Sequence, residues 1–434
     1  CWTSCSDFLE EDPKGQLPSD TYFSNKEDLD ASLTALYSVI ASSQASNNLC
    51  GTNFLVGDDI STHPSSNKQP LREHDQFDVK DNNSWLSSMW EQRFKVIKAA
   101  NFIINNAERT PEVSKEDIKV AIAQAHYWRA YSYFYLVTTW GRVPIMLKEE
   151  IDYNAPLKTE EEVYELILSD LKIAETGCPA MYTKEPYARN GMNIAVSEGA
   201  VKATMAYVYM CMAGWPLNKG VEYYKLAAAK AKEVIDGAEY SQVYSWEYNN
   251  KNTELLLGIY YNRDAMGQAA PLTDFLQDMK QAGWGDTNGE IKFWKNFPEG
   301  PRKDATYFPK IMFSDGKLYD WWYDTDPASR EVVAPVFMKT AEGAVRGTEF
   351  DYTNPTVVNA SGEKTFQLLR LSQVYCWYAE ATGRAGEIND QAVKVLNEVR
   401  NRADGEDTDK YTTDMSPDKL AEAAYDEHGW EMAG

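Results

Sequence analysis

The chain has 434 residues, of which 43% are hydrophobic and 25% are charged. This is enough apolar material for two or three domains or for one extended helical array. Its 43 Lys and Arg against 66 Asp and Glu give a net charge of −23, spread along the whole chain. Because Lys and Arg on phosphates supply nucleic-acid affinity, this balance argues against a nucleic-acid function, and no polybasic run suits an anionic membrane.

The chain begins with Cys1 rather than Met, and none of its six cysteines forms a C-x-x-C pair. No apolar run reaches the 18 residues of a membrane-spanning helix. An N-terminal Cys is typical of a processed bacterial lipoprotein, so we predict that Cys1 carries the lipid. Cys5 is the alternative, and a chance start of the chain is the alternative to both. Acyl chains contribute ~0.8 kcal/mol per buried CH₂, so several chains on one Cys anchor stably.

Helical and irregular segments alternate along the first half of the chain. Residues 1–24 are polar and contain Pro and Gly, which predicts a tether or an irregular wrap. Helical periodicity begins near Lys26 and is interrupted by a loop-rich stretch over 42–83. A stretch of this length without a period is usually functional or disordered, and its aspartates and aromatic residues favour function. A helical pattern then returns over 85–105.

Three later stretches are typical of helix pairs. The pairs join 118–139 to 160–176, 195–213 to 221–236 and 366–383 to 389–402. Each first helix carries small residues among large ones, such as Ala123 and Ala130, which lets a partner helix pack closely. We therefore predict a mainly α fold, a tetratricopeptide-like scaffold of helical hairpins over 26–236 and 366–402.

Residues 237–365, between the second and third pairs, differ in composition. They are rich in Trp, Tyr, Gly, Pro and Asn, and hold short strand-like pieces such as LLLGIYY. We interpret them as an irregular, loop-rich insertion on the helical scaffold, within a single domain over 1–434.

The segment AHYWRAYSYFYLVTTWGRVPI, residues 125–145, raises the question of a ligand platform. Its apolar positions cover nearly every face of a helix, which is typical of an interior helix. His126 is interpreted as a satisfied interior residue. Arg129 interrupts the apolar surface, and it should pair with a carboxylate because an unpaired buried charge is costly.

Most catalytic motifs are missing from the sequence. There is no phosphate-binding glycine loop, no G-x-S-x-G elbow and no H-E-x-x-H, and the four His are too scattered for a triad or a metal site. We expect no cofactor, no metal and no enzymatic activity. Paired carboxylates such as Asp58 and Asp59 could serve a glycosidase, but a chain of −23 produces such pairs by chance.

Aromatic residues outside the helices are the remaining chemical signal. Trp284, Trp294, Trp321 and Trp322 lie among Gly, Asn and Asp in segments with no helical period. An indole face is negative and the C–H face of a pyranose is slightly positive, so rings with nearby polar side chains suit a sugar. The alternative is that these rings pack the insertion onto the scaffold.

Several segments together resemble the SusD/RagB family of surface lipoproteins of Bacteroidetes. They are CSDFLEEDPKGQLPSDTYFSNKEDLDASLTALYSVI, WEQRFKVIKAANFIINN, QAHYWRAYSYFYLVTTWGRVPI, VSEGAVKATMAYVYMCMAGW, YYKLAAAKAKEVIDGAEYS, PEGPRKDATYF, LLRLSQVYCWYAEATGR and QAVKVLNEVRNRA. The resemblance covers almost the whole chain in the same order. It departs at YDEHGWEMAG, where family members continue, so we expect either that the C-terminus is shortened or that the C-terminal part is incomplete.

The resemblance implies a lipid anchor in the outer membrane at the cell surface. It also implies a partner, a SusC-like TonB-dependent barrel that receives oligosaccharides, or oligopeptides in the RagB branch, without bond cleavage. In sugar-binding relatives, aromatic residues of an early loop and a late insertion hold the ligand. These regions correspond here to 53–90 and 280–325.

The resulting hypothesis is a non-catalytic glycan-binding lipoprotein. The residues proposed to bind ligand are Asp58, Asp59, Trp85, Trp284, Trp321 and Trp322, with the Trp rings stacking on sugar faces and the Asp accepting hydroxyl hydrogen bonds. Trp85 could instead share a core helix face with Met89 and Phe94. Oligopeptide binding, a glycosidase and a pure protein-interaction scaffold are the alternatives.

Overall fold

The structure is a computed structural model. It describes residues 22–44, 57–150, 152–184, 187–189, 191–237, 240, 253–260, 283–313, 315–322, 332–339, 344–345, 349–350 and 365–434. The predicted lipid-bearing Cys1 and its alternative Cys5 lie outside these residues. None of the helices described is both long and apolar enough to cross a bilayer.

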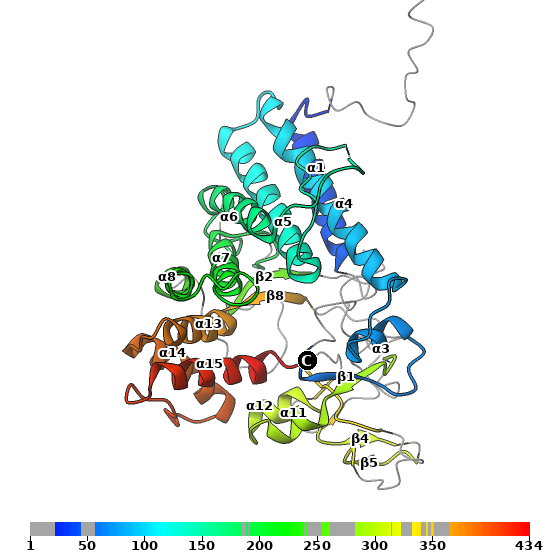
Figure 1. Ribbon diagram of the computed structural model, residues 1–434, viewed down its shortest axis with the longest axis vertical. Coiled ribbons are helices and arrows are strands. Elements are labelled where there is room, and N and C mark those ends of the chain that lie inside the picture. Colours follow the sequence, from blue (N-terminus) through cyan, green and yellow to red (C-terminus); the bar gives the residue numbers. More distant parts are fainter. Residues whose placement is uncertain are drawn as a thin grey trace, which may run out of the picture.

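Most of the described chain is helical (Figure 1). The helices are α1 (Lys26–Ser43), α3 (Gln69–Asp75), α4 (Ser84–Asn106), η2 (Ala107–Arg109), α5 (Lys115–Trp140), α6 (Glu160–Gly177), α7 (Glu198–Ala213), α8 (Val221–Asp236), α11 (Ile291–Asn296), α12 (Pro301–Thr306), α13 (Leu371–Arg384), α14 (Asp390–Asp404) and α15 (Pro417–Met432). The strands are β1 (Ile60–Thr62), β2 (Leu255–Ile259), β3 (Thr287–Gly289), β4 (Ile311–Met312), β5 (Leu318–Tyr319), β6 (Ala344–Val345), β7 (Glu349–Phe350) and β8 (Phe366–Arg370).

The predicted scaffold of helical hairpins is confirmed. The pairs α5–α6 and α7–α8 pack side by side, with α1 and α4 against α5 on one side and α13 against α8 on the other (Figure 1). Small residues permit these approaches. A Cβ added to Gly177, at the end of α6, would lie 2.5 Å from the Cβ of Ala123 on α5. This arrangement is the tetratricopeptide-like packing that the sequence predicts.

The aromatic segment 125–145 is interior, as predicted. All residues from Ala123 to Phe134 on α5 are buried, and Trp128 is among the largest side chains with almost no exposed surface. Asp170 on α6 is the carboxylate partner expected for Arg129: its two oxygens accept from Nε and Nη2 at 2.8 and 2.7 Å. His126 Nδ1 lies 2.6 Å from the same carboxylate, so His126 is a satisfied interior residue.

The third predicted pair needs two corrections. Residues 366–370, predicted to begin a helix, form strand β8 instead, which pairs antiparallel with β2 and brings Phe366 opposite Ile259. The helix α13 begins only at Leu371, and it packs more extensively against α15 than against α14. Closeness explains the preference for α15, because a Cβ added to Gly383 would lie 2.9 Å from the Cβ of Ala421.

Buried ion pairs join the C-terminal helices to the insertion. We call them the C-terminal ionic cluster, which consists of Glu254, Arg302, Arg370, Arg402, Glu427 and Glu431. Its three Arg and three Glu have no net charge. Arg302 on α12 reaches Glu427 on α15 at 2.8 Å, and Arg370 at the end of β8 reaches Glu431 at 2.7 Å. Mutual neutralisation is what makes burial of so many charges tolerable.

Candidate ligand-binding surface

Strands β1 and β3 bring the early loop and the insertion together. They pair antiparallel, with Ile60 opposite Gly289 and Thr62 opposite Thr287. Next to them, Ser66 Oγ donates to Asp286 Oδ1 at 2.5 Å. The two regions that the sequence singled out, 53–90 and 280–325, therefore meet, although more than 200 residues separate them in the chain.

Close packing under this strand pair requires a glycine. A Cβ on Gly289 would lie 2.7 Å from the Tyr307 ring and 3.2 Å from Pro335 Cβ. Tyr307 stacks on Phe337 with their ring centroids 4.9 Å apart. The pair β1–β3 thus rests on an aromatic layer, which gives the loops beside it a firm base.

Trp284 precedes β3 and is 57% exposed. Lys68, at the N-cap of α3, places its Nζ 5.2 Å from the centroid of the Trp284 ring. An ammonium at this distance makes a cation–π contact that holds the ring. With more than half of its surface open, the ring remains available for stacking on a ligand.

Trp322 is the second exposed ring, with 45% of its surface accessible. It follows β5 and packs against Trp294 of α11 and against its neighbour Trp321, with centroid distances of 5.3 and 5.5 Å. Trp321 is only 5% exposed and packs with residues such as Phe308 and Ile311. Trp321 therefore supports the exposed ring from beneath.

Trp85 and Asp59 lie further inside than a direct contact with ligand requires. Trp85, at the start of α4, is 9% exposed and packs with Ile60 and Tyr307. Asp59 Oδ2 accepts from the backbone N–H of Gly434 at 3.2 Å, and burial raises the pKa of this carboxyl above its ordinary value. Asp58 is exposed.

Three polar residues of the two regions were not among the predicted site residues. They are Lys68, Arg72 and Asp286. Asp286 is 5% exposed, and its Oδ2 accepts no hydrogen bond within the described residues. Asp286 stands two positions after Trp284, in the Gly- and Asn-containing pattern typical of sugar sites, but nothing in the sequence pairs it with Ser66.

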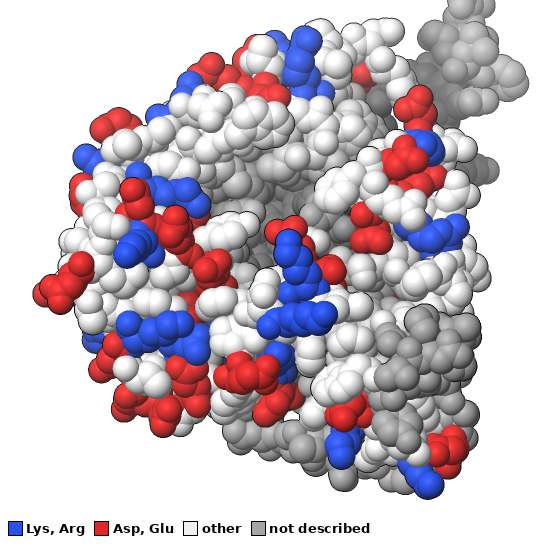
Figure 2. Space-filling model, turned by 60° about the horizontal axis from the view of Figure 1, so that its bottom comes forward, with Lys and Arg blue, Asp and Glu red and all other residues white. Residues whose placement is uncertain are grey.

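The face that comes forward in Figure 2 has a recess near its centre. Side chains of both signs lie along its border (Figure 2).

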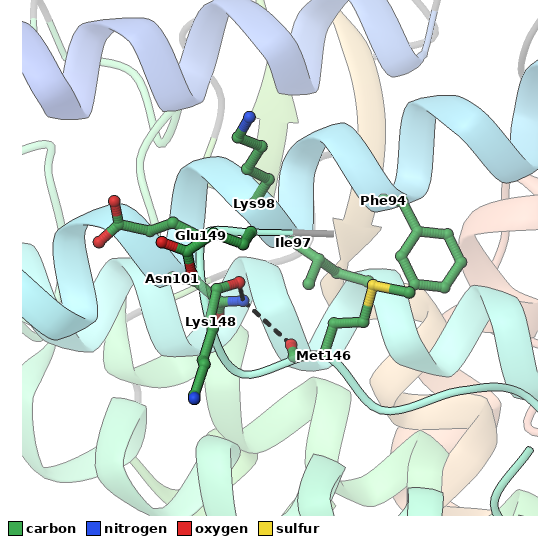
Figure 3. Close-up of a pocket in the computed structure, with 8 residues that line it drawn as sticks. Phe94, Ile97, Lys98, Asn101, Met146, Lys148 and Glu149 are labelled. Atoms are coloured by element: carbon green, nitrogen blue, oxygen red, sulfur yellow. Dashed lines mark hydrogen bonds between the residues drawn. The ribbon is translucent and has the colours of Figure 1, made fainter. Parts of the chain in front are cut away.

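A separate depression lies between α4 and the segment after α5 (Figure 3). Phe94, Ile97 and Met146 line it, and Asn101 Nδ2 donates to the backbone oxygens of Met146 and Lys148 at 3.0 and 2.9 Å. The depression has room for about one water molecule, far less than a sugar ring needs. Its hydrogen bonds hold the 146–148 segment against α4.

The described residues contain no group of three or more His, Cys, Asp or Glu side chains placed to hold a metal ion, and the acidic run at the end of α14 serves a structural role. In the acidic 404–409 run, Asp404 forms an ion pair with Arg400 at 2.7 Å, and Asp409 accepts from Asn401 at 3.0 Å. These carboxylates thus serve to cap and close the turn after α14.

Comparison with known proteins places the chain in a family. A family described as "Starch-binding associating with outer membrane" matches residues 7–210, and the SusD family matches residues 188–434. The chain is 25% identical to a SusD-like protein of Bacteroides ovatus over 93% of this chain and 74% of that protein.

Solved structures agree on the fold. A SusD homologue of Bacteroides thetaiotaomicron superposes with a TM-score of 0.81 at 19% identity, covering 97% of this chain and 86% of that one. A structure solved with a xylogluco-oligosaccharide has a TM-score of 0.69 at 22% identity, covering 93% and 82%. Since one family match spans more than half of the sequence, the chain belongs to the SusD family.

Proposed function

We propose that the protein is a non-catalytic, lipid-anchored protein of the outer-membrane surface that binds oligosaccharides. It delivers them to a SusC-like TonB-dependent transporter. The helical scaffold over 26–236 and 366–402 and the insertion over 237–365 act as one unit in this role, with Cys1 carrying the lipid. Family membership and the relative solved with a xylogluco-oligosaccharide support glycan as the ligand class.

One observation carries the proposal: two tryptophans are partly exposed, and contacts with neighbouring side chains fix the position of each ring. Trp284 is steadied by Lys68, and Trp322 by Trp294 and Trp321. A ring that is partly exposed and fixed in orientation by its neighbours can stack on a sugar face, and these two rings meet both conditions. The exposed Asp58 can accept hydrogen bonds from sugar hydroxyls. Four buried or partly buried residues support the surface from within: Trp85, Trp321, Asp59 and Asp286.

The test is calorimetry of the isolated protein with a panel of neutral and acidic oligosaccharides. Trp284→Ala and Trp322→Ala should each weaken binding of the glycan that binds best by about tenfold or more, because each removes a stacking surface. Trp215→Ala is the matched control: this ring is 85% exposed in the turn between α7 and α8.

Three outcomes would contradict the proposal. Unchanged affinity in both tryptophan variants would show that Trp284 and Trp322 do not form the binding site. Binding of a defined oligopeptide series, with no glycan bound, would change the ligand class. Release of shortened sugars from a bound glycan, monitored by chromatography, would make the protein an enzyme.

A further inference from the structure

A cation, Lys68, lies next to the exposed ring of Trp284, and a second cation, Arg72, follows one helical turn later in α3. Lys68 caps α3, and the Arg72 backbone N–H donates to the Lys68 oxygen at 3.3 Å. Side chains four residues apart on one turn are neighbours. Lys68 Nζ lies 5.2 Å from the Trp284 centroid, and Arg72 Nη1 donates to the backbone oxygen of Ser66.

Neither cation forms an ion pair with any acidic side chain of the described residues. Lys68 Nζ donates no hydrogen bond there, and only Nη1 of the Arg72 guanidinium does so. Two other cations of these regions do form ion pairs. Lys80 pairs with Asp78 at 2.5 Å, and Lys303 pairs with Glu299 at 2.6 Å.

The acidic side chains nearby are already bonded to neutral donors. Asp286 accepts from Ser66 Oγ, and Asp75 Oδ2 accepts from the Thr62 N–H at 3.2 Å. Glu73 accepts from Asn83 and Gln69, and these two hydrogen bonds lower the pKa of its carboxyl. None of these three carboxylates forms an ion pair with Lys68 or Arg72.

We infer that the glycan taken up at this surface is anionic. A sugar ring stacks on Trp284, while a uronate carboxylate or a sulfate half-ester on that sugar or its neighbour accepts from Lys68 Nζ and the free N–H groups of Arg72. The inference rests on the proposed function and names its ligand class. A neutral sugar needs only hydroxyl partners, whereas a guanidinium and an ammonium together match an oxyanion.

The net charge of the whole chain does not prevent this binding. At physiological salt, charges further than about 8 Å from the bound oxyanion are largely screened. In the proposed complex the oxyanion accepts directly from Lys68 and Arg72, so these two charges act on it with little screening.

The test compares two matched pairs of probes by calorimetry. Oligogalacturonate is measured against its carboxyl-reduced form, and a sulfated galactan oligosaccharide against its desulfated form. We expect the acidic member of one pair to bind and its neutral counterpart to bind at least about tenfold more weakly, as expected for the loss of a charged hydrogen bond. The pair that responds distinguishes a carboxylate ligand from a sulfate ligand.

Variants then connect the preference to the two cations. Lys68→Met and Arg72→Gln should each weaken binding of the acidic probe by about tenfold or more. Lys68→Arg, which keeps the charge, should retain most of the affinity. Lys80→Met is the control, since it removes one charge from the same segment at an exposed pair.

A second measurement needs no glycan. The fluorescence of Trp284 is obtained as the difference between the wild type and Trp284→Phe. The ratio of iodide to caesium quenching should be higher for Trp284 than for free tryptophan amide, because the cations attract the anion. This difference should vanish in the Lys68→Met/Arg72→Gln double variant.

Failure can be assigned to one proposal or the other. A neutral glycan that binds through Trp284 and is insensitive to Lys68→Met and Arg72→Gln would overturn this inference alone. A ratio of iodide to caesium quenching no higher than that of free tryptophan amide would also overturn it. No binding of any glycan, acidic or neutral, would overturn the proposed function and this inference together.

Discussion

Asp170 on α6 holds two residues of the interior helix α5 at once. Its oxygens accept from Arg129 Nε and Nη2, and His126 Nδ1 lies 2.6 Å away. Arg129 Nη1 reaches on to Asn101 of α4 at 2.8 Å. A single carboxylate, 1% exposed, thus connects three helices of the scaffold through one guanidinium.

Replacing Asp170 by Ala should therefore destabilise the protein strongly. The change leaves a buried Arg129 without a counter-charge, and such losses cost about 3–5 kcal/mol. Urea denaturation followed by circular dichroism measures the effect. The double variant Asp170→Leu/Arg129→Met should recover most of the loss, because it removes both charges. If Asp170→Ala unfolds at the same urea concentration as the wild type, the ion pair has no structural role.

At the scale of elements, the C-terminal ionic cluster is the main connection between scaffold and insertion. Glu254, just before β2, bridges Arg370 of β8 and Arg402 of α14 at 3.0 and 3.2 Å. Burial by itself would raise the pKa of Glu254, but the two arginines outweigh it and lower the pKa to about 2. The carboxylate is thus charged in the folded protein over a wide pH range.

This pKa predicts how stability depends on pH. The folded pKa of about 2 lies below the unfolded value near 4.5, so the unfolded chain binds the proton first as the pH falls. The stabilisation is fully present above about pH 5 and is lost between about pH 4.5 and 2, with a magnitude on the order of 3 kcal/mol.

Glu254→Gln gives the matching measurement. Its destabilisation relative to the wild type, from urea midpoints, should be large at pH 7 and less than half as large near pH 3. Glu406→Gln, a change in the exposed turn after α14, is the control and should show no such pH dependence. An equal effect of Glu254→Gln at both pH values would contradict the assigned pKa.

At the scale of the whole molecule, the candidate binding surface depends on contacts made far from it. The elements α11, α12, β4 and β5 lie at one end of the molecule, away from α1, α4, α5 and α6 (Figure 1). They are fastened by the β1–β3 pair and by Arg302, which donates to Glu427 and Glu431 of α15. The position of Trp322 on this end thus depends on an ion pair formed by α12.

Arg302→Met should therefore weaken glycan binding, although Arg302 is not one of the residues proposed to contact the ligand. Removing this buried cation leaves Glu427 and Glu431 undercompensated and loosens α12. We expect faster proteolysis within 283–322 and a several-fold lower glycan affinity, while the helical circular dichroism is retained. Arg384→Met, at a partly exposed pair with Glu380, is the control. Unchanged proteolysis and affinity would show that α12 is held by its apolar contacts alone.

Much of the scaffold could be predicted because the spacing of apolar residues along a helix indicates which of its faces are buried. The all-round apolar pattern of 125–145 predicts an interior helix, and the charge of Arg129 within it requires a carboxylate. Small residues such as Ala123 indicate where a partner helix approaches. These inferences hold because burial along a helix repeats every 3.6 residues, which is visible in one chain.

Strand β8 and helix α15 are two elements that the local sequence pattern did not predict. The apolar run of 366–370 fits either a helix or a strand, and it became a strand because β2, more than 100 residues away, offers a pairing edge. The helix Pro417–Met432 was not among the predicted pairs, although it is the principal partner of α13. Short apolar runs take the structure that distant segments allow.

By itself, the sequence determined the family, the helical hairpins and the two regions that carry the candidate surface. Only the tertiary structure decided which rings there are open. Trp321 and Trp322 are adjacent in the chain, yet one is 5% and the other 45% exposed, because irregular segments have no period to say which way a side chain faces. The contact of Lys68 with the Trp284 ring is likewise a product of the fold, because the two residues are far apart in the chain.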